Sequence, residues 1–385
     1  MADGILAGLR VVEVSAYVAA PFSGALLAGL GAEVIRIEQR GGGVDAQRWP
    51  IHDGRSLYRS GLDQGKRSVA IDLRSEAGQN LASDLICAEG DGGGLVITNL
   101  AAQGWLDYGT LAARRRDLVM VVITGLPHGG TAVDYTINAG VGFPWLTGPE
   151  DSEYPVNHVL PAWDVASGIL ATTALLAAER HRRLTGEGQL AKIALSDVAL
   201  AVANHLGYLG EARLIEEPRR RYGNYIYGTF GRDFQTSDGR YVMICALTPR
   251  QWRSLGEATG LSESFQELAQ SVHAQLELEG ERFRHREAIS EVLEPWVAQR
   301  TLSEIAVILD AHGVLWGPYR TFKQLVEEVD EAREPYASPI RFSSVDRTGA
   351  RPGPEIGSDT QHVLSETLGL SPEALGDLRR SAVID

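Results

Sequence analysis

Runs of β-branched and apolar residues alternate with stretches of helical period along the first half of the chain. A strand-like run at 9–15 (LRVVEVS), a short helical stretch at 21–31 and a second strand-like run at 32–38 (AEVIRIE) form a βαβ unit, which requires a parallel sheet. Further strands are predicted at 67–73, 94–100 and 118–125, with helices at 78–88 and 106–116. This alternation predicts a doubly wound α/β domain.

The pattern changes near residue 220. Before that point, a long helix ends near Gly186, "LAKIALSD" continues as a strand, and an apolar helix covers 198–209, so we expect the large domain to span 1–210. The following aromatic, Gly-rich stretch and an "SDG" turn predict a hairpin leading into helices. We therefore expect a smaller α+β domain at 220–335, and a C-terminal segment at 336–385 with one more helical pattern.

Composition narrows the class of partner. The 385 residues are enough for two domains, and the 44% hydrophobic content can fill substantial cores. The formal net charge of −14 disfavours nucleic acid and anionic membrane surfaces, because both are polyanionic. We expect neither a nucleic-acid nor a membrane partner.

The two cysteines, Cys87 and Cys245, indicate neither a disulfide framework nor a cysteine-based metal site. The N-terminal sequence has no basic region followed by an apolar core, and the most apolar run, 169–178, is too short to span a bilayer. These features predict a cytoplasmic protein without a targeting or membrane segment.

Several common cofactor motifs are missing from the sequence. The first βα loop reads "SAYVAAPFSG" instead of G-x-G-x-x-G, and there is no phosphate loop, H-E-x-x-H, CxxC pair or G-x-S-x-G. The nine histidines have no ligand spacing. We expect no metal and no cofactor.

One carboxylate attracts attention, at the start of the helix in "LPAWDVASGIL". Asp164 has a plain interpretation as the helix N-cap, a position that favours Asp. Alternatively, the helix dipole keeps it ionised as a covalent nucleophile toward an activated acyl group, and the free N–H groups of the helix stabilise an oxyanion. The small residues Ala162, Ala166, Ser167 and Gly168 would then let a bulky acyl carrier approach.

Beyond these local patterns, the chain resembles the class III CoA-transferases (the CaiB/BaiF family) over nearly its whole length. The resemblance rests on the order and spacing of "LAGLRVVEVSAYVAAPFSGALLAGLGAEVIRIEQRGGG", "GKRSVAIDLRSEAGQ", "VDYTINAGVGFPWLTG", "AWDVASGILATTALLAAERHRRLTGEGQ" and "EIGSDTQHVLSETLGL". It implies that Asp164 is the nucleophile and that the carrier is CoA, which the substrate brings. It also implies a Rossmann-like large domain that the C-terminal segment 336–385 returns to and completes, a smaller domain, and an interlocked homodimer.

Within the family, "RWP", "NHVLPAWD" and "WGPYRTF" are similar to the branch that moves CoA between the C1 and C4 carboxyls of mesaconyl-CoA. Intermolecular transfer to a dicarboxylate such as succinate is the main alternative. Racemisation of an acyl-CoA is disfavoured, because Val133 stands where racemases of this family have a histidine before Asp134. A CoA-ester isomerase acting by proton transfer and a non-catalytic CoA-binding protein are the remaining alternatives.

The predicted substrate-binding residues come from loops. Arg40, Lys66 and Arg67 follow strand-like segments and could offer charge to CoA phosphates. Asp134 could orient the acyl group or a neighbouring backbone, or cap a helix, and His158 could meet a substrate carboxylate. Family positions for the CoA site and for a mobile loop over the nucleophile are occupied by Tyr17, Val18, Ala19, Asn99, Leu100, Gly228 and Gly231. Ordinary packing is the alternative for each.

Overall fold

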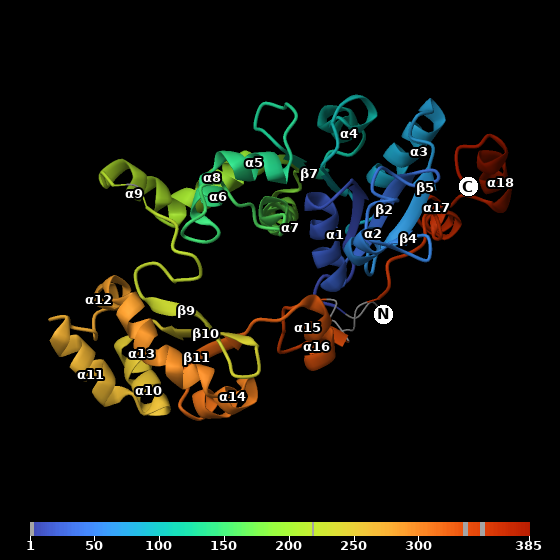
Figure 1. Cartoon of the computed structure of the whole chain (residues 1–385). Coiled ribbons are helices and arrows are strands. Elements are labelled where there is room, and N and C mark those ends of the chain that lie inside the picture. Colours follow the sequence, from blue (N-terminus) through green and yellow to red (C-terminus); the bar gives the residue numbers. More distant parts are fainter. Residues whose placement is uncertain (1–3, 218, 334–337, 347–350) are drawn as a thin grey trace. The chain divides into compact units, whose positions relative to one another are not determined.

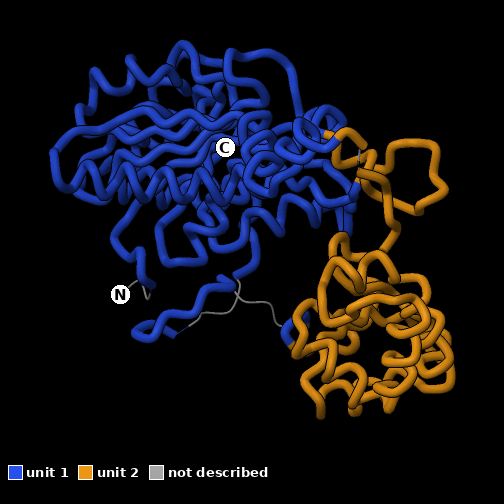
Figure 2. The backbone as a smooth tube through the Cα atoms, turned by 90° about the vertical axis from the view of Figure 1, so that its left-hand side faces the viewer, with its two compact units in different colours: residues 1–141, 158–215, 331–385 blue, residues 142–157, 216–330 orange. Residues whose placement is uncertain are grey.

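A computed structural model describes residues 4–217, 219–333, 338–346 and 351–385. The chain divides into two compact units: residues 1–141, 158–215 and 331–385 form unit 1, and residues 142–157 and 216–330 form unit 2 (Figure 2). The predicted boundary between 335 and 336 lies outside the described residues.

Unit 1 is built around a parallel six-stranded sheet with the order β5-β2-β1-β6-β7-β8 (Figure 1). The fold is therefore the expected α/β class. The strands are β1 (Arg10–Val14), β2 (Glu33–Gln39), β5 (Arg67–Ile71), β6 (Leu95–Thr98), β7 (Val119–Thr124) and β8 (Gln189–Ala194).

Several helices of unit 1 begin after residues whose side chains cap the first turn. α3 (Glu76–Cys87) and α4 (Tyr108–Arg114) start after Ser75 and Asp107, whose side chains accept backbone N–H groups of the first turn. The other described helices of this unit are α1 (Ala19–Gly29), α2 (Leu57–Leu62), the 3-10 helix η1 (Gly104–Leu106), α5 (Asp134–Gly140), α7 (Ala162–Thr185), α8 (Leu195–His205), α9 (Tyr208–Leu214), α16 (Asp330–Arg333, at the boundary with unit 2), α17 (Thr360–Leu368) and α18 (Pro372–Arg380). A small hairpin, β3 (Ile51–His52) and β4 (Arg55–Ser56), precedes α2.

The two faces of the sheet differ in character. Alternate strand residues such as Val12, Ile35 and Val69 join α3, α17 and α18 in a continuous apolar core. The opposite face contacts α1 and α7. The C-terminal segment belongs to unit 1, where an antiparallel bridge joins Ile384 to Ile71 at the edge strand β5.

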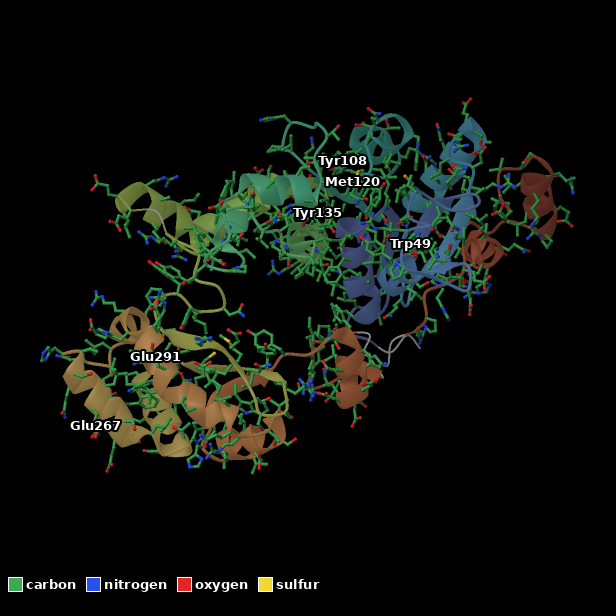
Figure 3. The ribbon with its side chains drawn as sticks, viewed as in Figure 1. Trp49, Tyr108, Met120, Tyr135, Glu267 and Glu291 are labelled. Carbon is green, nitrogen blue, oxygen red and sulfur yellow. The ribbon has the colours of Figure 1, made fainter. Side chains whose placement is uncertain are left out.

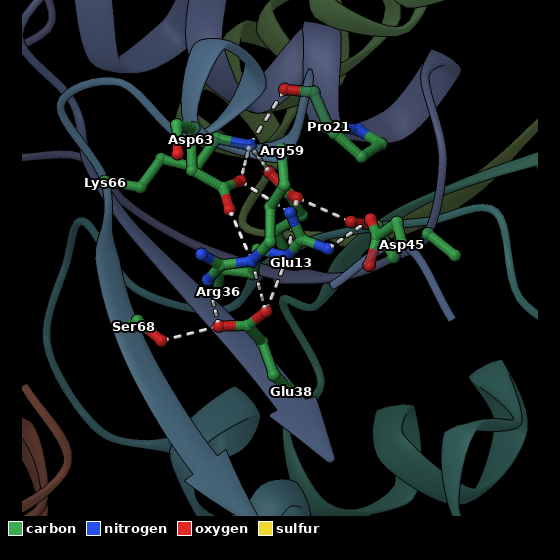
Figure 4. A network of polar contacts seen from close by, with 12 residues as sticks. Glu13, Pro21, Arg36, Glu38, Asp45, Arg59, Asp63, Lys66 and Ser68 are labelled. Atoms are coloured by element: carbon green, nitrogen blue, oxygen red, sulfur yellow. Dashed lines mark hydrogen bonds and ion pairs between the residues drawn. The ribbon is translucent and has the colours of Figure 1, made fainter. Parts of the chain in front are cut away.

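The α1 side of strands β1, β2 and β5 carries a buried charge network, which we define as Glu13, Arg36, Glu38, Asp45, Arg59, Asp63 and Lys66 (Figure 4). Its centre is Arg36, whose guanidinium lies 2.6 Å from Asp63 and 2.7 Å from Asp45. Burial opposes the charge of Arg36, but the surrounding carboxylates raise its pKa overall. Three cations thus form direct ion pairs with all four carboxylates and offset three of their four negative charges.

Unit 2 contains the antiparallel sheet β11-β10-β9. The hairpin of β9 (Phe230–Gln235) and β10 (Tyr241–Ala246) turns at the predicted "SDG". The third strand, β11 (Leu315–Pro318), was not predicted. The helices are α6 (Phe143–Leu146), α10 (Pro249–Thr259), α11 (Ser262–Ser271), α12 (Glu279–Arg284), α13 (Arg286–Ala298), α14 (Leu302–Ala311) and α15 (Phe322–Glu328).

The predicted domain limits differ from the two compact units, because one segment of the predicted large domain belongs to unit 2. Residues 142–157 belong to unit 2, although they lie within the predicted large domain. Arg221 explains this placement, because its buried guanidinium donates to the carbonyl oxygens of Ser152, Tyr154 and Pro144. Residues 331–335 were predicted in the small domain, whereas unit 1 resumes at 331.

Candidate active site

A cavity of about 450 Å3 lies in unit 1 at the carboxyl ends of three neighbouring strands. The loops after β1, β6 and β7 bring Tyr17, Asn99 and Gly125 to its wall, where an open parallel sheet usually binds its ligand. The cavity is lined by Tyr17, Val18, Ala19, Arg48, Tyr58, Asn99, Ile123, Thr124, Gly125, Ala132, Val133, Asp134, Tyr135, Pro161, Asp164 and Leu195.

Asp164 lines this cavity from the first turn of α7. The plain interpretation as an N-cap is wrong, because the helix begins at Ala162 after Pro161 and Asp164 is its third residue. Its carboxylate is part-buried and faces the cavity, close to Arg48 and Asp134.

Asp134 provides the cap that Asp164 does not. Its Oδ2 accepts the backbone N–H groups of Trp163 (2.7 Å) and Asp164 (3.1 Å), so a carboxylate from α5 closes the N-terminus of α7. The N–H groups that we expected to stabilise an oxyanion are therefore occupied. The other oxygen of Asp134, Oδ1, is buried without a hydrogen-bond partner among the described residues. Tyr135, the next residue of α5, lines the same cavity as Asp164 (Figure 3).

The expectation that the helix dipole keeps Asp164 ionised is also wrong. Burial, and then the negative charge of Asp134, raise the pKa of Asp164 to about 7, against the opposing effect of Arg48. A carboxyl group with this pKa is about half ionised at neutral pH and is more basic than an ordinary aspartate. The greater basicity makes the ionised form of Asp164 a better nucleophile toward an acyl carbon.

A guanidinium and two phenol rings form another part of the wall. Arg48 lies 4.7 Å from the ring centroid of Tyr58 and 5.5 Å from that of Tyr17. Burial and then the proximity of Asp164 and Tyr135 raise the pKa of the Tyr58 hydroxyl, while Arg48 lowers it. The charged groups at this wall are thus close enough to influence one another.

Four of the loop residues predicted for CoA binding lie at the cavity: Tyr17, Val18, Ala19 and Asn99. The Asn99 side chain binds both backbone groups of Ala16, accepting from its N–H at 2.9 Å and donating to its oxygen at 2.6 Å. Tyr17 has a positive φ of 62°, and its N–H donates to Asp45 at 3.3 Å. Asn99 and Asp45 therefore fix the shape of this loop.

The three basic residues predicted to meet CoA phosphates have other roles. Lys66 is buried in the charge network, 2.7 Å from Glu13 and 2.8 Å from the oxygen of Pro21, so it has no access to a ligand. Arg40 binds Asp385 at 2.8 Å. Arg67 binds Glu33 and Glu366 at 2.5 and 2.9 Å. We expected these residues at the ligand-binding edge of the sheet because they follow strand-like segments. Their side chains instead pair with carboxylates of distant segments, and the sequence alone does not reveal this pairing.

Two more predicted residues of unit 1 do not line the cavity. The ring of His158 lies with Nε2 3.1 Å from Oδ1 of Asn138 and with Nδ1 2.5 Å from the oxygen of Leu160. Because the Trp163 indole also donates to that Asn138 oxygen, His158 helps fix the start of α7. Leu100 is 39% exposed beside Asn99 without reaching the cavity wall.

Gly228 and Gly231 belong to unit 2. Gly228 has a φ of 84°, a conformation that favours glycine, and open space around it. A Cβ atom on Gly231 would lie 2.6 Å from Ile226 and 3.1 Å from the Cys245 sulfur, so hairpin packing already explains that glycine. Their predicted place over the nucleophile stays a prediction.

Two of the four small residues near Asp164, Ser167 and Gly168, do not open the site to a carrier as we expected. Ser167 is fully buried, and a Cβ atom on Gly168 would lie 2.7 Å from the oxygen of Ala19 and 3.0 Å from Phe22. These residues therefore let α7 pack closely against α1, which holds the first turn of α7 in place.

Sequence reasoning missed Arg48, Tyr58 and Tyr135 at this site. Arg48 belongs to the stretch "RWP" that supported the family resemblance, but a single arginine in a loop gives no signal of its role. Tyr58 lies on α2 and Tyr135 on α5, and only the folded chain brings them to one cavity.

The described part of the chain contains no group of three or more His, Cys, Asp or Glu side chains suited to a metal ion. None of its helices combines the length and the apolar character that a membrane crossing requires.

The parallel α/β unit, with a carboxylate at a cavity over its strand ends, agrees with comparisons to known proteins. The model of the family "CoA-transferase family III" matches residues 6–360. The chain belongs to this family and is an enzyme of the class III CoA-transferase type.

Among individual relatives, the chain is 48% identical to 2-methylfumaryl-CoA isomerase of Chloroflexus aurantiacus, over 99% of this chain and 98% of the relative. It is 26% identical to succinyl-CoA–D-citramalate CoA-transferase of the same organism, over 98% and 97% of the two chains. A crystal structure of a CaiB/BaiF family protein from Brucella suis matches with a TM-score of 0.78 and 25% identity, covering 95% of this chain and all of that one.

Proposed function

We propose that the protein moves CoA within one molecule, between the C1 and C4 carboxyls of mesaconyl-CoA (2-methylfumaryl-CoA), with Asp164 as the nucleophile. The observation that carries this proposal is the part-buried Asp164 at the cavity, with a pKa raised to about 7. The 48% identity to an isomerase of this substrate supports the choice of acyl group.

The proposed reaction starts when a carboxylate oxygen of Asp164 attacks the C1 carbonyl carbon of the thioester. The C–S bond breaks, and a mixed anhydride and CoA thiolate form. The thiolate then attacks the aspartyl carbonyl carbon, giving an aspartyl-CoA thioester and free mesaconate. The second carboxylate of mesaconate attacks the carbonyl carbon of this thioester, so that the C–S bond breaks and a second mixed anhydride and CoA thiolate form. The thiolate then attacks the C4 carbonyl carbon of this anhydride, which gives mesaconyl-C4-CoA and restores the Asp164 carboxylate.

In the proposed steps, Asp164 and a carboxylate of mesaconate each act once as nucleophile and once as leaving group, so their basicities should be similar. An Asp164 carboxylate that is more basic than usual is a better nucleophile toward the thioester, and its partial burial limits the access of water to the anhydride. No cofactor other than the CoA of the substrate enters these steps. The interlocked homodimer and the cytoplasmic location belong to the proposal as well.

Intermolecular transfer is the second candidate, because the relatives with lower identity carry the names of such transferases. Racemisation is disfavoured, because Val133 lines the cavity at the position where a racemase of this family would need a histidine.

Incubation of the enzyme with mesaconyl-C1-CoA and isotope-labelled free mesaconate separates the candidates. We expect mass spectrometry to find the C4 ester without the label, since the mesaconate stays in the cavity until it is esterified again. Efficient entry of the label into the product would favour intermolecular transfer. Deuterium from solvent in the acyl chain would instead point to proton-transfer chemistry.

A further inference from the structure

Arg48 is the only residue with a cationic side chain among the described residues that line the cavity. The same wall carries two carboxylates, Asp134 and Asp164. Asp134 already interacts with the backbone of α7 through Oδ2. Arg48 is therefore the available partner for any anionic group that enters beside Asp164.

The position of Arg48 is fixed through its backbone. Its N–H donates to the oxygen of Asp45 at 3.1 Å, and its own oxygen accepts from the Ser56 hydroxyl at 2.5 Å. Asp45 is in turn held by Arg36 in the buried charge network (Figure 4). These contacts fix the backbone of Arg48, and with it the Cβ atom of the side chain, before any ligand binds.

The guanidinium itself rests on aromatic rings. Tyr58 and Tyr17 hold it by cation–π contact, and within the described ranges no ion pair joins it to a carboxylate. This differs from Arg36, Arg59 and Lys66, whose charges are paired inside the protein. The guanidinium also donates a hydrogen bond to the Tyr58 hydroxyl, and its remaining N–H donors are left for a ligand, where the planar fork suits a carboxylate.

We propose that Arg48 binds the free, non-esterified carboxylate of the acyl group and so makes the enzyme selective for CoA monoesters of short dicarboxylic acids. This rests on the proposed function, in which the substrate carries a second carboxylate. That carboxylate would otherwise enter a cavity with two aspartates and no other lining cation. Once mesaconate is free it has two carboxylates, and Arg48 holds one while the other faces the aspartyl thioester.

The test compares two CoA esters that differ only at the second carboxylate. Mesaconyl-C1-CoA carries it, whereas tiglyl-CoA has a methyl group in its place. Labelling of Asp164 is followed by trapping the acyl-enzyme with hydroxylamine and measuring the modified peptide by mass spectrometry. We expect the wild-type enzyme to be labelled faster by mesaconyl-C1-CoA by about 30-fold, the effect of one charge pair in a part-buried site.

Arg48→Gln should slow labelling by mesaconyl-C1-CoA about 30-fold more than it slows labelling by tiglyl-CoA, so that most of the difference between the two esters disappears. Arg48→Lys keeps the charge without the fork and should fall between the two. Arg55→Gln is the matched control, because it removes one positive charge from an exposed ion pair with Glu355 outside the cavity.

The outcomes separate the two proposals. If neither ester labels Asp164 in the folded wild-type enzyme, the proposed function fails. If mesaconyl-C1-CoA labels the wild type, but Arg48→Gln slows both esters equally or neither, the role of Arg48 is overturned. Thermal unfolding of each variant checks the fold, and Arg48→Lys decides the matter if Arg48→Gln does not fold.

Discussion

The chain contains two groups of inward-facing carboxylates that solve the same electrostatic problem differently. In the buried charge network, three cations accompany four carboxylates. Burial alone would raise the pKa of Asp63, but the positive charges of Lys66, Arg36 and Arg59 lower this pKa overall. At the cavity, Arg48 faces two aspartates, and the pKa of Asp164 rises to about 7. The direct ion pairs of Asp63 favour its charged form, whereas Asp164, which makes no ion pair among the described residues, titrates near neutral pH.

The strongest way to break this comparison is to remove the reactive carboxylate. Asp164→Ala should lower C1-to-C4 transfer by about 1,000-fold or more, because no nucleophile remains to form the anhydride. Chromatographic separation of the two mesaconyl-CoA esters measures the rate, and circular dichroism checks that the fold persists. An Asp164→Ala enzyme with wild-type activity would sink the mechanism.

Breaking an ion pair of the buried charge network should instead lower the stability of the fold. Lys66→Met removes a fully buried cation and leaves Glu13 and Asp63 short of a partner, so we expect a loss of about 3–5 kcal/mol in the free energy of unfolding. Urea unfolding measures it. The control Arg55→Met, at an exposed ion pair, should lose no more than about 1 kcal/mol. Unchanged stability with a weakened KM for the CoA ester would restore Lys66 as a CoA ligand.

The pH dependence of stability should have opposite signs at the two clusters. Asp63, with its lowered pKa, stabilises the fold above its unfolded pKa, and this contribution is lost in acid. Asp164 contributes most below its unfolded pKa near 4, and the contribution is lost as pH rises through about 7.

Asp164→Asn should therefore unfold like the wild type near pH 4 and be more stable at pH 8, by roughly 2–4 kcal/mol. Urea unfolding at both pH values measures the difference. A variant that gains no stability at pH 8 would show that Asp164 ionises there without penalty, and would remove the electrostatic contrast between the clusters.

The smallest expected effect concerns the cap of α7. Asp134→Asn keeps an oxygen for the N–H groups of Trp163 and Asp164 but removes the negative charge, so the pKa of Asp164 should fall and kcat/KM should rise at lower pH than in the wild type. Asp134→Ala also removes the cap and should lose about 1–2 kcal/mol of stability. An unshifted pH–rate profile in Asp134→Asn would mean that burial alone sets the pKa.

The sequence by itself determined the α/β class, the strands of the parallel sheet, the hairpin of unit 2 and the family, since these depend on hydrophobic period, turn residues and the order of motifs. It also singled out Asp164. Tertiary structure alone decided the partners: Asp134 caps the helix that carries Asp164, Arg48 reaches the cavity, and Lys66 is buried. The reason is that pairing and desolvation of charge depend on distances between segments far apart in the chain, which local sequence patterns do not encode.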